Sequence, residues 1–288
     1  MNNYVIFTDS ACDFSAGDIE SRGIYCCSLS FRFNDSDKLY SNSDMPIKEF
    51  YDKMREGGVA KTSAVNSEEF AQAFEPVLKE GKDILYIGFS SGLSTTYNSA
   101  RLASEQLKES YPDRKIITVD SLAASAGNAL LVDLVLDKKN AGASIEEAKE
   151  YAEQMRLKIC HWFTVDDLVY LKRGGRVSST TAFVGNMLGI KPILHVDNDG
   201  HLINVGKVRG RKMSIATLAK KYGELHDDDN IKKVYISHSD CIDDANELAS
   251  IIEKDYGVKV QLITDVGAVI GAHSGPGTLA LFFVGTER

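Results

Sequence analysis

Hydroxyl side chains crowd one short segment of the chain, residues 88–99, whose sequence is GFSSGLSTTYNS. The apolar run before it, residues 83–87, is typical of a buried strand, and residues 97–107 are predicted to form a helix. An open α/β sheet binds ligands where a strand passes into a helix, because free N–H groups and the helix dipole favour an anion there. The segment has no lysine and no GK[ST] sequence, so it suits a carboxylate or a single phosphate better than a nucleotide.

Three further groups of hydroxyl side chains follow predicted strands in the first half of the chain. They are Thr8 to Ser10, Thr62 with Ser63, and Ser121. Serine and threonine are also ordinary cap and loop residues, so one such turn alone would mean little. Because the carboxyl ends of parallel strands meet at one edge of a sheet, the turns together favour a shared binding pocket.

A glycine-dense segment, residues 267–277, surrounds His273 ahead of the last predicted strand. Glycine permits close backbone approach, so this segment is either one wall of a site or a tight turn with an exposed histidine. Two basic clusters, residues 172–176 and 207–212, stand out in a chain whose net charge is −8. Guanidinium groups bind carboxylate and phosphate bidentately, so the clusters suit an anionic ligand or an acidic partner, with solvated surface charge as the alternative.

Ser90 lies in a G-x-S-x-G sequence, residues 88–92, which resembles the nucleophile turn of serine hydrolases. Asp265 and His273 follow it in the order of a hydrolase triad. In hydrolases the turn leads directly into a helix, whereas several residues separate Ser90 from the predicted helix in this chain. A serine hydrolase using Ser90 is therefore the alternative rather than the main hypothesis. The six histidines are scattered along the chain, which argues against a metal site.

The elements that would position these groups alternate between strands and helices up to about residue 157, which predicts a parallel, doubly wound α/β sheet. Beyond that point, residues 190–196 and 201–208 flank the turn sequence DNDG, which predicts an antiparallel hairpin of a kind that the first half lacks. We therefore predict two α/β domains, residues 1–158 with the parallel sheet and residues 159–288 with a mixed or antiparallel sheet. The second domain is expected to contain helices at 180–188, 211–223 and 242–255 and strands at 232–237, 258–263 and 278–284.

The composition limits the classes of function. A chain of 288 residues, of which 43% are hydrophobic, can form the cores of two domains. The net charge of −8 argues against a nucleic-acid partner. The five cysteines are odd in number and form no CxxC pair, which fits a reduced, cytoplasmic compartment. Neither a signal peptide nor an apolar run long enough for a transmembrane segment is visible.

Eight motifs, taken in order, resemble those of the DegV family and together span nearly the whole chain. Singly each motif is weak, but their order makes the resemblance specific. The motifs are TDSACD at 8–13, KTS at 61–63, SGLS through YNSA at 91–100, VDS at 119–121, LVYLKRGGRVS at 168–178, GIKPIL at 189–194, GKVRGRK at 206–212 and GAHSGPGT at 271–278.

The resemblance implies a lipid-binding protein that is not itself an enzyme and that needs no cofactor or metal. Family members of this kind bind a long-chain fatty acid in the cleft between their two domains. They present its carboxylate to a separate, ATP-dependent fatty acid kinase subunit, which forms the acyl phosphate. A carrier of another small anionic lipid is a further alternative for this chain.

The resemblance also implies roles for individual residues. Thr62 and Ser94 would hydrogen-bond the carboxylate, with His273 beside them. The neighbouring head-group loops would be supported by Ser63, Ser91, Thr95, Gly271 and Ser274, and the head group or the kinase would be contacted by Arg173 or Arg176 and by Arg209 or Arg211. Thr95 stands where the family usually has glycine, and Ala64 with Val65 stands where it often has Gln-Pro.

A fatty acid tail needs a long apolar tunnel. Burying about 14 methylene groups at about 0.8 kcal/mol each is worth roughly 11 kcal/mol before ordering costs, so the tail would dominate affinity and the head group would set orientation. Apolar residues of the kind that line a tunnel, or that simply pack in a core, are Phe31, Phe33, Phe163, Phe183, Met187 and Leu188.

Overall fold

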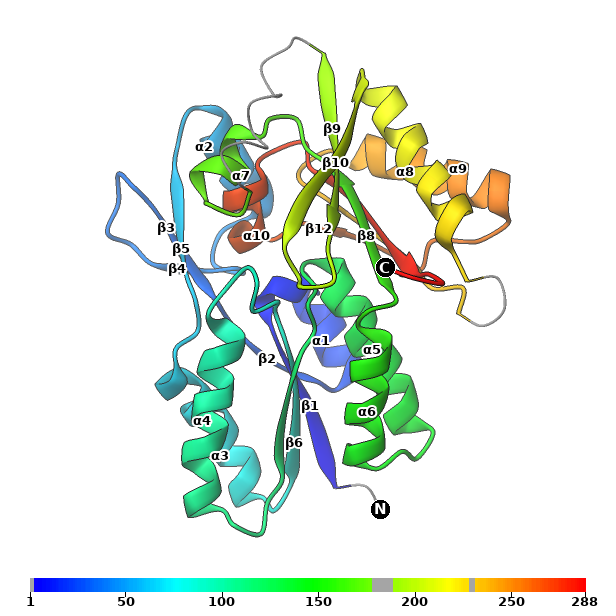
Figure 1. The fold of residues 1–288 in the computed structure, drawn as a ribbon. Helices are drawn as coiled ribbons and strands as arrows, with labels where there is room; N and C mark the ends of the chain where they lie inside the picture. The colour runs from blue at the N-terminus through cyan, green and yellow to red at the C-terminus, as the bar shows by residue number, and fades with distance from the viewer. Residues whose placement is uncertain (1–2, 178–188, 228–230) are drawn as a thin grey trace.

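The computed structural model describes residues 3–177, 189–227 and 231–288. Three sheets organise these residues (Figure 1). The helix predicted at 180–188, together with Phe183, Met187 and Leu188, lies outside the described residues.

A parallel sheet forms the base of the first half of the chain. Its strand order is β2-β1-β6-β7, and helices cover both of its faces, as the alternation of strands and helices predicted. Successive side chains of β1 and β6 point to opposite faces of the sheet. Ile6 and Leu85 therefore pack in the core on one face, while Phe7 and Tyr86 pack in the core on the other. The strands are β1 (Tyr4–Asp9), β2 (Tyr25–Cys27), β6 (Asp83–Gly88) and β7 (Ile116–Asp120). The helices are α3 (Ser67–Lys79) and α4 (Thr96–Ser110) on one face, and α1 (Ala16–Arg22), α5 (Ala126–Asn140) and α6 (Ile145–Met155) on the other.

A second, antiparallel sheet in the first half was not predicted from the sequence. Its order is β4-β3-β5, formed by β3 (Ser30–Phe33), β4 (Tyr40–Ser41) and β5 (Ala60–Ser63), and α2 (Ile47–Arg55) packs against it. The expectation that the first half lacks antiparallel pairing is therefore wrong. Residues 61–63 form a strand rather than a loop, because β3 supplies the backbone partners that their polar sequence does not suggest.

The third sheet is mixed and belongs to the second half, as predicted. Its order is β10-β9-β8-β13-β11-β12, and only β11 and β12 among its described pairs run parallel. The β9–β10 hairpin forms as predicted, while the strand expected at 258–263 begins later. The strands are β8 (Ile159–Thr164), β9 (Ile190–Val196), β10 (Leu202–Arg209), β11 (Val234–His238), β12 (Leu262–Asp265) and β13 (Leu279–Val284). One face is covered by α8 (Arg211–Leu225) and α9 (Ile242–Tyr256), and the other contacts α5.

Short helices occupy segments that were expected to be turns. The glycine-dense segment around His273 contains α10 (Ala268–Ser274), which ends at Gly275 with a φ of +82°. The turn after β1 is a 3-10 helix, η1 (Ser10–Cys12). A further short helix, α7 (Val169–Arg173), includes the first two residues of the basic cluster at 172–176. No helix in the described ranges is long and apolar enough to cross a membrane. The division at residues 158 and 159 stays a prediction; β1–β7 precede it and β8–β13 follow it.

Candidate functional site

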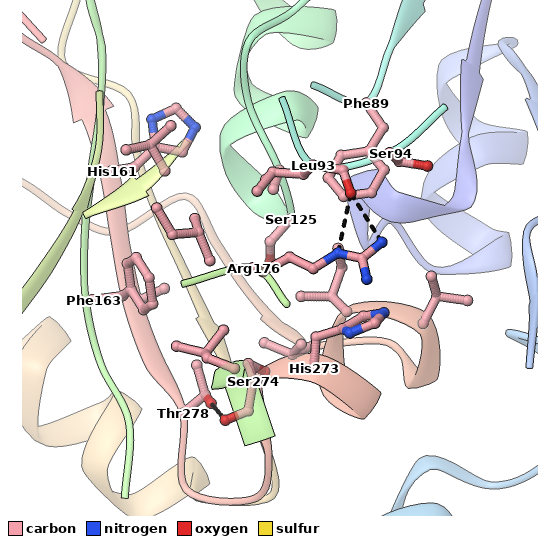
Figure 2. A pocket seen from close by; sticks show the side chains of 18 of the residues that line it. Phe89, Leu93, Ser94, Ser125, His161, Phe163, Arg176, His273, Ser274 and Thr278 are labelled. Atoms are coloured by element: carbon pink, nitrogen blue, oxygen red, sulfur yellow. Dashed lines mark hydrogen bonds between the residues drawn. The ribbon is translucent and has the colours of Figure 1, made fainter. Parts of the chain in front are cut away.

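A cavity of about 450 Å³ lies between the two halves of the chain (Figure 2). The carboxyl-terminal loops of β6 and β7 form one wall, and the mixed sheet with α10 forms the other. Most of the lining is apolar, which is typical of a site for a molecule with a substantial hydrocarbon part. The larger apolar residues of the lining are Leu29, Phe89, Leu93, Phe163, Leu171, Val196, Leu202, Val266, Val269, Ile270 and Phe282.

Thr62 and His273 meet at one end of this cavity, although 211 positions separate them in the sequence. The Oγ1 atom of Thr62 lies 2.8 Å from Nε2 of His273. The other ring nitrogen, Nδ1, is buried without a partner among the described residues and packs against Gly174, where a methyl group would overlap it. An unpartnered N–H costs more than an unpartnered lone pair, so we assign the proton to Nε2. His273 then donates to Thr62, and the Thr62 hydroxyl hydrogen is left to donate to a ligand.

Burial is the main reason that the pKa of His273 falls to about 4, and the positive charge of Arg176 lowers it further. The imidazole is therefore neutral at pH 7. A neutral donor suits a role in holding the Thr62 hydroxyl rather than in carrying charge.

Ser94 lies at the same end of the cavity, directly before α4. Its Oγ atom accepts a hydrogen bond from the backbone N–H of Thr96 and lies 2.9 Å from Thr96 Oγ1. Thr95 also lines the cavity, and its φ of −76° shows that this backbone does not need the glycine that the family usually has there. The replacement therefore adds a hydroxyl and a methyl group to the cavity rim without straining the loop.

Arg176 supplies a positive charge to this end of the cavity. Its Nε and Nη2 atoms each donate to the carbonyl of Leu93 at 3.1 Å (Figure 2). Its Nη1 atom donates to Gly174 O at 2.5 Å. Within the described part of the chain, no Asp or Glu makes an ion pair with it. Burial lowers the pKa of Arg176, but a guanidinium stays charged, so the cation is available to a ligand anion.

The structure brings most of the predicted site residues to the cavity but not all of them. Seven line it, namely Thr62, Ser91, Ser94, Thr95, Arg176, His273 and Ser274. Ser63 is exposed at the end of β5 and does not line the cavity, and Arg173 and Arg209 are exposed. Arg211 is occupied by an ion pair with Asp244 at 2.9 Å. Contact of any of these residues with a ligand stays a prediction.

Gly271 has a packing role. It lies inside α10 with its Cα against Tyr51, whose buried hydroxyl donates to Val266 O at 2.7 Å and lies at hydrogen-bond distance, 3.0 Å, from Ser239 Oγ. A methyl group at Gly271 would overlap the Tyr51 ring and hydroxyl. The glycine therefore allows α10 to approach α2.

We expect Gly271→Ala to lower the free energy of unfolding by about 1–3 kcal/mol, because the side chain that it meets is held by two hydrogen bonds. Gly17→Ala in α1 is the matched control, since its nearest neighbour is Ser15 Oγ at 3.9 Å. There the alanine should leave stability unchanged or raise it by up to ~1 kcal/mol. Urea unfolding of both variants tests the difference, and equal stability of the two would contradict the packing role.

Ser90 is not placed as a nucleophile. Its side chain is fully buried, and its Oγ donates to Gly200 O at 2.9 Å. The two other members of the suggested triad are engaged elsewhere, since His273 bonds Thr62 and Asp265 lies 3.6 Å from Nδ1 of His238. The geometry does not support the serine hydrolase alternative.

Sequence reasoning missed several residues that build the site. Phe89 and Phe282 line the cavity, whereas Phe31 and Phe33 belong to a separate core with Phe50. Of the expected phenylalanines that the structure describes, only Phe163 lines the cavity. Asp13 was also missed, although it closes the first motif. Its Oδ1 accepts from Gly267 N at 3.0 Å and its Oδ2 accepts from Ser125 Oγ at 2.5 Å, and burial raises its pKa to about 7.

One group of possible metal ligands occurs among the described residues, at the β9–β10 turn. Ligand atoms of Asp197, Asp199 and His201 lie within 4.8 Å of one another, and the group is largely exposed. Asp197 Oδ1 already accepts from the backbone N–H groups of Asp199 and His201, which explains the cluster as part of the turn.

Residues 3–286 match the model of the DegV family, described as an uncharacterised protein family. A DegV domain-containing protein of Clostridium perfringens is 44% identical, with 100% of this chain and 99% of that protein covered. The chain belongs to the DegV family.

Two solved structures illustrate the shared fold. A Thermotoga maritima protein, described as revealing a fatty acid binding function, is 31% identical with a TM-score of 0.84, covering 99% of this chain and 100% of that one. A stearic-acid-binding protein of Eubacterium ventriosum is 27% identical with a TM-score of 0.87, covering 97% of this chain and 98% of that one.

Proposed function

We propose that this DegV-family chain binds a long-chain fatty acid in the cavity between its two halves. The carboxylate lies at the end formed by Thr62, Ser94 and Arg176, and the tail runs among the apolar side chains between Leu93 and Phe282. Relatives that are described as fatty-acid-binding proteins share this fold over nearly their full length.

One observation carries the proposal: a guanidinium without an acidic partner, among the residues described, lies at one end of a cavity whose lining is mostly apolar. A ligand with a single negative charge and a long apolar part satisfies both ends at once. The cation holds the carboxylate, Thr62 and Ser94 donate hydrogen bonds to it, and the apolar wall removes the tail from water.

We further propose that the bound carboxylate is presented to a separate, ATP-dependent kinase subunit. Ser91 and Thr95 are exposed beside the head-group end, so a partner can reach the carboxylate from solvent. A carboxylate oxygen would attack the γ-phosphorus of ATP bound by the partner, the bond to ADP would break, and the acyl phosphate would remain on this chain. The exposed Arg173 and Arg209 are candidate contacts for the partner.

Ligand extraction tests the binding proposal directly. We expect mass spectrometry of a solvent extract of the purified protein to identify a long-chain fatty acid, and titration calorimetry to show binding of added acid after delipidation. A different anionic lipid in the extract would support the alternative carrier function. If the extract contains no long-chain fatty acid and the delipidated protein does not bind added acid, the proposal is rejected.

The combined change Thr62→Val and Ser94→Ala tests the head-group assignment. Two donors to a charged group are lost, so we expect fatty acid affinity, and acyl phosphate formation with the kinase subunit, to fall about 10- to 100-fold. Ser63→Ala is the control, because this neighbouring hydroxyl does not line the cavity. Unchanged affinity and unchanged acyl phosphate formation in the double variant would show that the carboxylate binds elsewhere.

A further inference from the structure

Ser90, which resembles a hydrolase nucleophile in the sequence, joins the two halves of the chain in the structure. Its hydroxyl, fully buried, donates across the interface to Gly200 O at 2.9 Å and accepts from Gly92 N at 3.2 Å. The acceptor carbonyl belongs to the turn between β9 and β10, which lies beside the loop after β6. This contact therefore fixes the loop at residues 89–95, which carries Ser94 and is called the head-group loop below, against the second half of the chain.

The backbone of Ser90 also shapes the loop that carries the predicted head-group donors. Its carbonyl accepts from the N–H groups of Leu93 and Ser94, both at 3.1 Å, and its own N–H donates to Ala123 O at 2.9 Å. The turn that results directs Leu93 O at Arg176 and places Ser94 at the cavity. The position of Ser90 thus determines where both Arg176 and Ser94 lie.

The β9–β10 turn is built to receive this contact. Gly200 has a φ of +79°, and a methyl group there would overlap the Ser90 hydroxyl. A methyl group at Gly92 would lie only 2.9 Å from Asp199 O, so the two backbones are as close as glycine permits. The side chain of Arg288 also stabilises the β9–β10 turn, because its Nη1 atom donates to the carbonyl of Asp197 at 3.0 Å.

We propose that Ser90 is a positioning residue that locks the head-group loop to the β9–β10 turn and so sets the preference of the cavity for a carboxylate. The proposal rests on the proposed function, because it assigns the lock to the same head-group end. The contact fixes the loop that carries the head-group donors, so its loss is expected to affect binding of a carboxylate more than binding of an apolar tail.

Comparison of two ligands that share a tail separates positioning from general stability. We expect Ser90→Ala to weaken binding of palmitic acid about tenfold, as for one hydrogen bond to a charged group, while binding of the alcohol of equal chain length changes less than twofold. In a Ser94→Ala background the Ser90→Ala change should weaken acid binding less than it does in the wild-type protein, because one of the two groups that it positions is absent. Ser104→Ala, which removes a buried serine bond to Ile116 O at 3.3 Å, is the control and should leave both affinities unchanged.

Gly200→Ala tests the same lock from the other side, and it keeps the proposal testable if Ser90→Ala folds poorly. We expect it to reduce acid affinity like Ser90→Ala. The double variant should regain part of the lost stability, because the overlap with the Ser90 hydroxyl is relieved, without regaining acid affinity. Unchanged acid affinity in folded Ser90→Ala, or equal losses for acid and alcohol, would overturn the positioning role. Wild-type protein that binds neither ligand would instead reject the proposed function.

Discussion

Ala280→Phe is expected to weaken binding of long-chain fatty acids at least about 100-fold while short acids still bind as in the wild-type protein. Ala280 lies on β13 directly opposite Phe163 of β8, and both line the cavity. A phenylalanine there would fill the space through which the tail is proposed to run. If about four methylene groups are excluded at about 0.8 kcal/mol each, roughly 3 kcal/mol of binding free energy is lost, which corresponds to a factor of at least about 100.

Titration with acids of increasing chain length measures this effect. Wild-type affinity should rise with each added methylene, whereas affinity of the Ala280→Phe variant should stop rising at the length that meets the new ring. Ala280→Val is the graded control and should move the limit to a longer chain. The same chain-length profile for all three proteins would show that the tail does not pass β13.

The parallel sheet of the first half could be predicted, because its strands and helices have clear hydrophobic patterns. Buried strands such as β6 are short apolar runs followed by amphipathic helices, and this alternation has one common solution, the doubly wound sheet. The small antiparallel sheet could not be predicted in the same way. Residues 60–63 are half exposed and mostly polar, so their strand conformation depends on the pairing with β3 rather than on their own sequence.

The head-group end could be predicted from motifs, but the orientation of its arginines could not. Arg173 and Arg176 lie in one basic cluster, and nothing in the sequence indicates which of the two side chains faces the cavity. Gly175 has a φ of +71°, and this left-handed residue turns the chain so that Arg176 enters the cavity while Arg173 remains exposed over Tyr170. Side-chain direction after such a turn is a property of the assembled loop.

The tail region was the least predictable part. Phe31, Phe89 and Phe282 are equally hydrophobic, yet only the last two line the cavity. Phe31 is fully buried between α2 and the small sheet, and its neighbours there include Phe50. A phenylalanine can contact a ligand only where the packed layers around it leave a cavity. Composition and periodicity do not show where that cavity lies.

Arg176→Met is expected to remove the preference of the cavity for an anion. Methionine retains much of the apolar stem but none of the charge, and Arg176 is the cation at the head-group end that makes no ion pair within the described part of the chain. Hydrogen bonds to a charged group are worth about 1.5–3 kcal/mol, so we expect fatty acid affinity to fall about 10- to 100-fold. The alcohol of equal chain length should bind the variant about as well as it binds the wild-type protein.

Lys172→Met is the matched control, since Lys172 is an exposed cation in the same turn and does not line the cavity. It should leave acid and alcohol binding unchanged. If Arg176→Met binds the acid as tightly as the wild-type protein does, the carboxylate lies elsewhere and Arg176 only ties the Leu93 carbonyl to its own turn. If acid and alcohol binding fall together, loss of the two bonds to Leu93 has displaced the loop, and the charge itself contributes little. Selective loss of the acid is therefore the result that assigns the guanidinium to the carboxylate.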